Sequence, residues 1–198
     1  MARFTTLGAE NITTIITLAE AKIHLRVGDS RDDAYITSLI FAAQNVIENY
    51  CNINLMQRSV IQTCDTWEDT KILLISPPAN SGQVILTSVQ YYNTANVIAT
   101  DTLGNYILDN GSTPPRLELK QDKTYPKTYE RNGAIRVTYL CGVSAANKIP
   151  VALKQAALIF VGQFYENRQI DIVGRTVGTI PTAAKFLMEP YRIQTLGC

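Results

Sequence analysis

The amino-acid sequence predicts an α+β fold in which N- and C-terminal helices form a small helical bundle with an inserted antiparallel β-sheet or sandwich. Apolar residues recur every three or four positions near both ends of the chain and every second position between them. No helical pattern separates the short predicted strands, which favours antiparallel pairing. We therefore expect a single domain over residues 1–198, with helices at about 17–50 and 150–168, the β section at about 54–140, and a C-terminal hinge and short helix at 171–192.

Composition is that of an ordinary globular protein. Of 198 residues, 46% are hydrophobic and 18% are charged, which suffices for a core without disulfides or metal. The formal net charge of +1 gives no overall basic field that would drive nonspecific nucleic-acid binding. The N-terminus lacks a signal-peptide pattern, and the longest apolar run, Ala156–Gly162, is far shorter than the roughly 20 residues that span a bilayer. We expect a protein made in the cytosol, without membrane contact.

The first section of the chain predicts two helices. Thr17-Leu18-Ala19-Glu20 is a capping-box pattern that begins a short helix ending at about Leu25. Ser30 is predicted to cap the second helix, with Asp32 and Asp33 in its first turn, where acidic residues favour the helix dipole. The last helices or a neighbouring subunit must cover the apolar face of this second helix, which carries Ile36, Leu39, Ile40, Ala43, Val46, Ile47 and Tyr50.

Short runs of alternating residues, separated by turn residues such as Pro77-Pro78 and Asn132-Gly133, predict the strands of the middle section. Between the last two runs, residues 125–131 are predicted to form a solvated hairpin loop. Trp67 fits either core packing or an interface anchor. The predicted strands cover residues 60–63, 71–75, 84–92, 106–108, 116–119 and 135–139.

The third section returns to helix. Pro150 suits a first helical turn, because its missing N–H would have no partner in the helix. The helix that follows is apolar on every side, which predicts a central position in the fold or partial burial by another subunit. The polar stretch 171–179 predicts a hinge, Pro181 opens a short helix to about Glu189, and Pro190 is predicted to end it.

No catalytic, cofactor or metal pattern is evident in the sequence. The segment Gly174–Gly178 lacks the spacing of a phosphate-binding loop. The chain has one histidine, His24, predicted to be partly buried in a helix, and no nucleophile-elbow motif. Asp32 and Asp33 are adjacent and diverge on a helix, so they are not expected to share an ion. We therefore predict no enzyme activity, no cofactor and no metal.

The cysteines have no metal-ligand spacing. Cys51, Cys64, Cys141 and Cys198 are scattered through the chain. In a reducing cytosol such thiols are usually small buried hydrophobes. We expect this for all of them except Cys198, which should be exposed.

The order of these parts resembles the head-to-tail connector, or adaptor, proteins of tailed bacteriophages, and the resemblance covers nearly the whole chain. The chain departs from that pattern at Leu140-Cys141, where the family usually has a small residue or Thr-Ala before the glycine. The pieces that carry the resemblance are 18–27, 32–36, 40–43, 48–51, 88–92, 135–139 followed by Cys141-Gly142, 149–156 running to 165–168, and 187–192.

This resemblance implies a structural role. Such proteins form a ring, commonly dodecameric, beneath the portal at one capsid vertex, and they extend the DNA channel and provide a docking site for stopper or tail proteins. The implied partners are the portal protein, a stopper or tail-completion protein and other copies of the chain. DNA would pass through without sequence-specific binding. The implied location is the virion, after synthesis in the cytoplasm of the host bacterium.

Our hypothesis for the interaction site is that the helices form the ring body and that residues 174–192 dock on the portal. Phe186, Leu187 and Tyr191 would be apolar anchors. The basic side chains that could pair with portal carboxylates are those of Arg175, Lys185 and Arg192.

Two alternatives stay open. A tail-completion protein or another β-rich interaction module of a phage or phage-derived particle would bind tail components and not the portal. A small enzyme using Asp or Glu with an external metal would be stabilised against heat by that metal.

Overall fold

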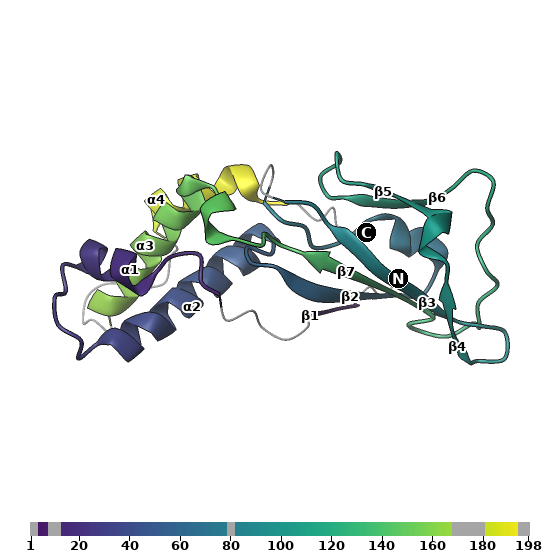
Figure 1. Cartoon of the computed structure of the whole chain (residues 1–198), viewed down its shortest axis with the longest axis horizontal. Helices are drawn as coiled ribbons and strands as arrows, with labels where there is room; N and C mark the ends of the chain where they lie inside the picture. The colour runs from purple at the N-terminus through teal and green to yellow at the C-terminus, as the bar shows by residue number, and fades with distance from the viewer. Residues whose placement is uncertain (1–3, 8–12, 79–81, 168–180, 194–198) are drawn as a thin grey trace.

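The computed structural model describes residues 4–7, 13–78, 82–167 and 181–193. The molecule is elongated, with its helices at one end and its strands at the other (Figure 1). The expected α+β class is confirmed. Within the described ranges no helix is both long and apolar enough to span a bilayer. The elements are β1 (Phe4–Leu7), α1 (Leu18–Leu25), α2 (Asp33–Cys51), β2 (Arg58–Cys64), η1 (Trp67–Lys71), β3 (Ile85–Tyr92), β4 (Ile98–Asp101), η2 (Leu103–Asn105), β5 (Tyr106–Asp109), β6 (Arg116–Leu119), β7 (Ile135–Cys141), η3 (Ala146–Lys148), α3 (Val151–Glu166), α4 (Thr182–Met188) and η4 (Glu189–Tyr191).

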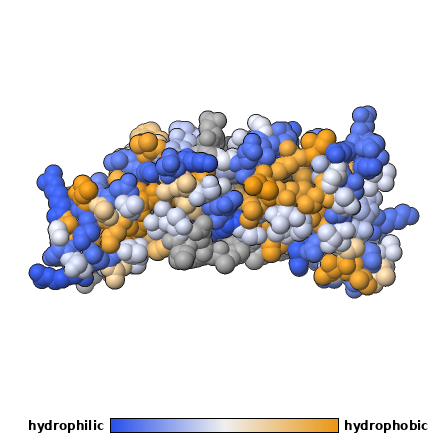
Figure 2. Space-filling view, in the orientation of Figure 1, coloured by the Kyte–Doolittle hydropathy of each residue, from blue (hydrophilic) through white to orange (hydrophobic). Residues whose placement is uncertain are grey.

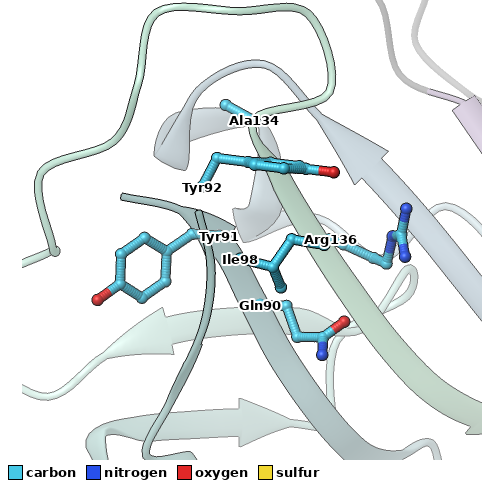
Figure 3. A pocket seen from close by; sticks show the side chains of 6 residues that line it. All are labelled: Gln90, Tyr91, Tyr92, Ile98, Ala134 and Arg136. Atoms are coloured by element: carbon cyan, nitrogen blue, oxygen red, sulfur yellow. The ribbon is translucent and has the colours of Figure 1, made fainter. Parts of the chain in front are cut away.

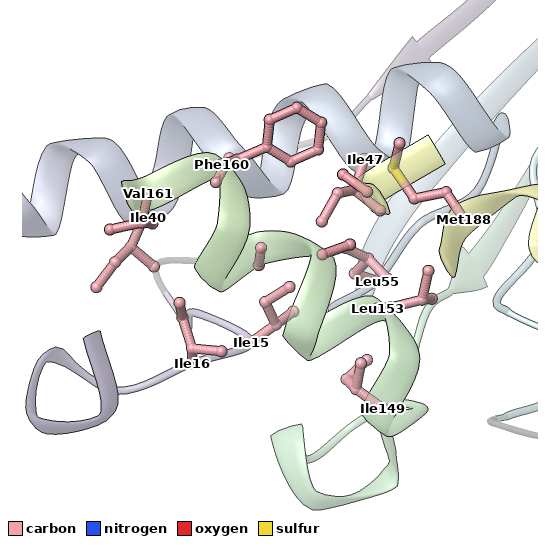
Figure 4. Packing of buried hydrophobic residues seen from close by; sticks show 14 of the residues in the cluster. Ile15, Ile16, Ile40, Ile47, Leu55, Ile149, Leu153, Phe160, Val161 and Met188 are labelled. Atoms are coloured by element: carbon pink, nitrogen blue, oxygen red, sulfur yellow. The ribbon is translucent and has the colours of Figure 1, made fainter. Parts of the chain in front are cut away.

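The helical end is built around α3, which packs against α1, α2 and α4. Its predicted central position is therefore confirmed, and the apolar face of α2 is covered by the last helices of the same chain. Burial contributes roughly 1.5–3 kcal/mol per large apolar side chain, far more than differences in helix propensity. The core shown in Figure 4 includes Ile15, Ile16, Ile40, Ile47, Leu55, Ile149, Leu153, Phe160, Val161 and Met188.

The sheet end has a second core. Five antiparallel strands lie in the order β1-β2-β7-β3-β4, and β5 pairs with β6 in a separate hairpin. This hairpin and η1 contribute to a core against one face of the larger sheet. The core is formed by Val60, Cys64, Leu73, Val84, Val89, Tyr106, Leu117, Ala134, Ile135, Val137, Tyr139 and Cys141.

The strand predictions were correct at β2, β3, β5, β6 and β7 and wrong at residues 71–75. Among these, Lys71 ends the η1 turn and Ile72 makes only an isolated bridge. The buried Gln62 side chain explains the difference, since its Nε2 donates to the Ile72 carbonyl and its Oε1 accepts from the Leu74 N–H. A side chain therefore satisfies backbone groups that a strand neighbour would otherwise pair. The short edge strands β1 and β4 were not predicted.

The helix starts show one correct prediction and one error. The Thr17–Glu20 capping box is present as predicted. Ser30 does not cap α2, because the N-cap residue is Asp32, and the Asp32 side chain accepts instead from the Tyr165 hydroxyl of α3. Asp33 pairs with Lys22 Nζ at 2.6 Å, so the two aspartates diverge as expected.

The C-terminal helices begin close to their predicted positions. Pro150 and Pro181 are the N-cap residues of α3 and α4 and precede their first turns. Helix α4 ends at Met188, one residue before the predicted end at Glu189, and Pro190 lies in the 3-10 turn η4 that follows it to Tyr191. The predicted hinge at 171–179 lies outside the described residues.

A buried ion pair lies where the two ends of the molecule meet. Glu48, near the end of α2, accepts from Arg58 at the start of β2, and the two side chains are only 6% and 9% exposed. The second carboxylate oxygen of Glu48 accepts from the Leu55 N–H at 2.8 Å, and Arg58 Nε donates to Asn54 at 2.8 Å. Burial raises the pKa of the Glu48 carboxyl, while the Leu55 N–H and the Arg58 charge oppose that rise.

A close backbone contact lies beside this pair. The Gln57 N–H donates to the Val143 carbonyl, and the Val143 N–H donates to the Leu55 carbonyl. Gly142 has φ +99°, and a Cβ there would lie 2.4 Å from the Met56 carbonyl oxygen. Only glycine allows the two connecting segments to approach this closely.

Three cysteines of the described part, Cys51, Cys64 and Cys141, are free and buried, as predicted. Burial raises the pKa of Cys51 and of Cys141 to about 12. Cys198 lies outside the described residues.

Replacing Arg58 with Met should destabilise the fold by about 3–5 kcal/mol, because it leaves the Glu48 carboxylate buried and unpaired. Urea unfolding monitored by circular dichroism measures this. The double variant Glu48→Gln/Arg58→Met, which removes the buried charge and keeps an acceptor for Leu55, should recover part of the loss. Arg31→Met is the control, since its side chain is 88% exposed in a surface ion pair, and it should change little. Equal effects of Arg58→Met and Arg31→Met would contradict the argument.

The buried thiols should resist labelling in the folded protein. In a Cys198→Ser variant at pH 8, Ellman's reagent should release almost no chromophore until denaturant is added, when three thiols should react. Burial raises the pKa of Cys51 and Cys141 to about 12, well above pH 8, so these two thiols stay protonated and unreactive in the folded protein, and Cys64 is buried as well. Rapid native labelling of any of the three would show that its surroundings open.

Candidate functional site

The C-terminal helix α4 is fixed to the end of α2 by main-chain and side-chain contacts. The Ile193 N–H donates to the Cys51 carbonyl at 2.8 Å, and the Asn52 amide donates to the Ile193 carbonyl at 3.1 Å. Ala184 and Met188 enter the helical core. The side of α4 that carries these two residues is therefore internal, and only its opposite side is available to a partner.

The structure separates the predicted portal-contacting residues into two groups. Phe186 is 76% exposed and Lys185 is exposed beside it, so both are available at the surface. Leu187 and Tyr191 are half-buried against the helical core and also serve the fold. Arg175 lies outside the described residues.

The last residue of the predicted set, Arg192, is exposed but already has intramolecular contacts. Its guanidinium lies 3.8 Å from Glu189 and 5.1 Å from the centre of the Tyr50 ring. The Tyr50 hydroxyl donates to the same Glu189 carboxylate at 2.7 Å. A partner carboxylate would have to compete with Glu189 for this cation.

Sequence reasoning missed a second group of exposed apolar side chains, on the sheet end. Figure 2 shows hydrophobic residues gathered on this half of the molecule, including the tip of the β3–β4 hairpin. At that tip Val97 is 57% exposed and Ile98 is 49% exposed, and Ile107 on β5 is 52% exposed. The hairpin was missed because Thr100 and Asp101 weaken the apolar alternation of β4.

A shallow pocket lies beside this hairpin. It is lined by residues of β3, β4 and β7, including Tyr92, Ile98 and Arg136 (Figure 3). The Arg131 guanidinium lies 4.0 Å from the centre of the Tyr92 ring. The lining has two tyrosines and one arginine but no carboxylate, thiol or imidazole, so it offers no acid–base pair for catalysis.

Trp67 packs within the chain. Its ring stacks on Tyr125 with centroids 5.0 Å apart, and its indole N–H donates to the Pro126 carbonyl at 2.9 Å. The centroid of the Tyr91 ring lies 5.9 Å from that of Trp67. Trp67 therefore attaches part of the predicted solvated loop 125–131 to the sheet core, while Lys127 and residues 129–131 remain exposed.

His24 is exposed, so the prediction that it is partly buried was wrong. It lies over the surface of Gly162 on α3, where the absence of a side chain leaves room for the imidazole. In the part of the chain that the structure describes, no group of three or more His, Cys, Asp or Glu could hold a metal ion.

Comparison with known protein families supports the predicted resemblance to connector proteins. A model of the phage gp6-like head-tail connector protein family matches residues 15–115, just over half of the chain. No curated protein sequence matches the chain.

Solved structures of particle necks have the same fold. A chain in the neck of an empty GTA particle computed with C6 symmetry is 23% identical with a TM-score of 0.75. A chain in the virion of the native gene transfer agent (GTA) particle is 23% identical with a TM-score of 0.72, and one in the neck of the native GTA particle computed with C12 symmetry is 22% identical with a TM-score of 0.72. Each alignment covers 100% of this chain and 99% of the other. With the fold and the family match in agreement, the chain belongs to the phage gp6-like head-tail connector proteins.

Proposed function

We propose that this chain is a structural head-to-tail connector subunit that forms a ring beneath the portal, extends the DNA channel and provides the docking site for stopper or tail proteins. The observation that carries the proposal is the family match over residues 15–115. The similar chains come from particle necks computed with C6 and C12 symmetry, which supports a cyclic and dodecameric assembly. The proposed location is the virion, at the junction of capsid and tail.

The distribution of exposed apolar residues supports more than one interface. Ile23 on α1, Val151 at the start of α3 and Phe186 on α4 are each at least 76% exposed at the helical end. Val97 and Ile98 are exposed at the opposite end of the molecule. A connector needs contacts with the portal, with the tail side and with its own neighbours, and this distribution provides surfaces for them.

For the portal contact we propose the outer side of α4. Phe186 is the apolar anchor, and Lys185 beside it can pair with a portal carboxylate. Leu187 and Tyr191 support the helix from its inner side. Arg192 and Arg175 add positive charge to the same C-terminal segment.

Passage of DNA requires a channel that does not hold the polymer. A net charge of +1 gives the subunit no strong attraction for phosphates. The face of the five-stranded sheet opposite its core carries Arg136, hydroxyl and amide side chains and apolar residues such as Ile61 and Leu140. Among the paired residues of β2, β3, β4 and β7 that share this face there is no carboxylate. Such a face would neither repel nor tightly bind the phosphate backbone.

The proposal predicts stoichiometric binding to the portal ring encoded beside this protein. Co-sedimentation followed by native mass spectrometry should count about one copy per portal subunit. Phe186→Ser should weaken this binding at least tenfold, as expected from the loss of about 1.4 kcal/mol or more at an aromatic anchor. Ile107→Ser is the matched control, since Ile107 is 52% exposed on β5 at the other end of the molecule, and it should bind normally.

Two outcomes would separate the alternatives. Normal binding by Phe186→Ser would remove α4 as the portal-contacting surface but keep the connector role. Binding to tail components with none to portal would instead identify a tail-completion protein.

A further inference from the structure

We infer that β4 of one subunit pairs with β1 of the next, so that the five-stranded sheets of neighbouring copies join edge to edge around the ring. The inference depends on the proposed function for the existence of a ring. What it adds is the contact between copies, which is main-chain hydrogen bonding between two strands that were absent from the sequence prediction.

Both edges of the sheet are available for pairing. Among the described residues, β1 pairs only with β2, and β4 pairs only with β3. Each therefore leaves one row of backbone donors and acceptors without a strand partner. The two strands have the same length of four residues.

Several of the features that usually prevent edge-to-edge pairing are absent, although both strands are short and β4 carries Asp101. Soluble proteins protect an exposed edge with short strands, charged side chains, Pro, a bulge or a covering loop. Strands β1 and β4 contain no Lys, Arg or Pro, and the bulge of this sheet lies between β3 and β7. Beside the β4 edge, Val97 and Ile98 expose about half of their surface. We expect an edge of this kind, with exposed apolar side chains beside it, to be covered in the assembled state.

The strand directions favour a cyclic contact between copies. Four successive antiparallel pairs separate β1 from β4, so the two edge strands run in the same direction. A rotation that brings β1 of one copy beside β4 of the next makes them parallel, and the same operation can be repeated until the ring closes. A two-fold dimer would instead pair an edge with its own copy, β4 with β4, and leave both β1 edges unpaired.

The strand register identifies positions that would approach each other. Thr5 lies in a row that crosses the sheet through Gln62, Val137 and Val89 to Asp101 on β4. Ala99 is on the same face as Asp101, two residues earlier. Asp101 accepts bonds from Tyr106 and Asn105, so Ala99 is the better position for a reporter thiol.

The test is cross-linking of Thr5→Cys/Ala99→Cys in the full-length Cys198→Ser chain, in the ring assembled on the portal. Native Cys51, Cys64 and Cys141 are buried and should not compete. A short bismaleimide should give a ladder of covalent multimers, and peptide mapping should find residue 5 joined to residue 99. Neither single variant should give a ladder.

A charge placed on the edge provides an independent measurement. Ile98→Lys should reduce ring assembly at least tenfold by native mass spectrometry, whereas Ile107→Lys should leave it unchanged. Ile107 is the matched control because it is 52% exposed on the separate β5–β6 hairpin.

The outcomes are distinguishable. A ring that forms without the 5–99 cross-link and tolerates Ile98→Lys would overturn edge pairing and leave the connector role intact. Dimers from Ala99→Cys alone would show two-fold pairing and also overturn the inference. Absence of any ring, with or without portal, would remove the proposed function and this contact together.

Discussion

The buried ion pair between Glu48 and Arg58 is the interaction on which the rest of the structure depends. It joins the last turn of the longest helix to the first strand of the sheet core, at the point where the chain passes from one hydrophobic core to the other. A charge pair buried to this extent is retained only with good geometry and added hydrogen bonds, and the Leu55 N–H and Asn54 provide these. Beside this ion pair, Gly142, which follows β7, packs closely against the backbone of Met56.

The two cores explain how a chain of this size can form an elongated molecule. Each half buries its own apolar residues, and the junction between them uses polar bonds and a close backbone contact. The ends of the molecule can then carry different surfaces without disturbing one another. This division fits our proposal of a connector subunit, which would have neighbours above, below and at both sides.

On α4, burial distinguishes residues that hold the fold together from residues that are available to a partner. Met188 and Ala184 hold the helix in the core, while Phe186, on the opposite side of the same short helix, is left exposed. Sequence alone assigned Phe186, Leu187 and Tyr191 one role, because all three are apolar or aromatic near the C-terminus. Only packing shows that Leu187 and Tyr191 are partly used by the fold.

The sequence by itself determined the α+β class, the Thr17–Glu20 cap, the buried face of α2, the central position of α3 and the family resemblance. These features depend on local periodicity and on the order of elements, and both can be read from the sequence. Tertiary structure decided the features that depend on partners distant in the chain. The Gln62 side chain bonds to the backbone of the predicted strand 71–75, which therefore does not form. The Asp32 carboxylate accepts a hydrogen bond from Tyr165 instead of capping α2. Pairing between strands distant in the sequence places β1 and β4 at the edges of the sheet. Strands β1 and β4 lack a clear alternation of apolar and polar residues, so their existence and their open edges follow only from the neighbours with which they pair.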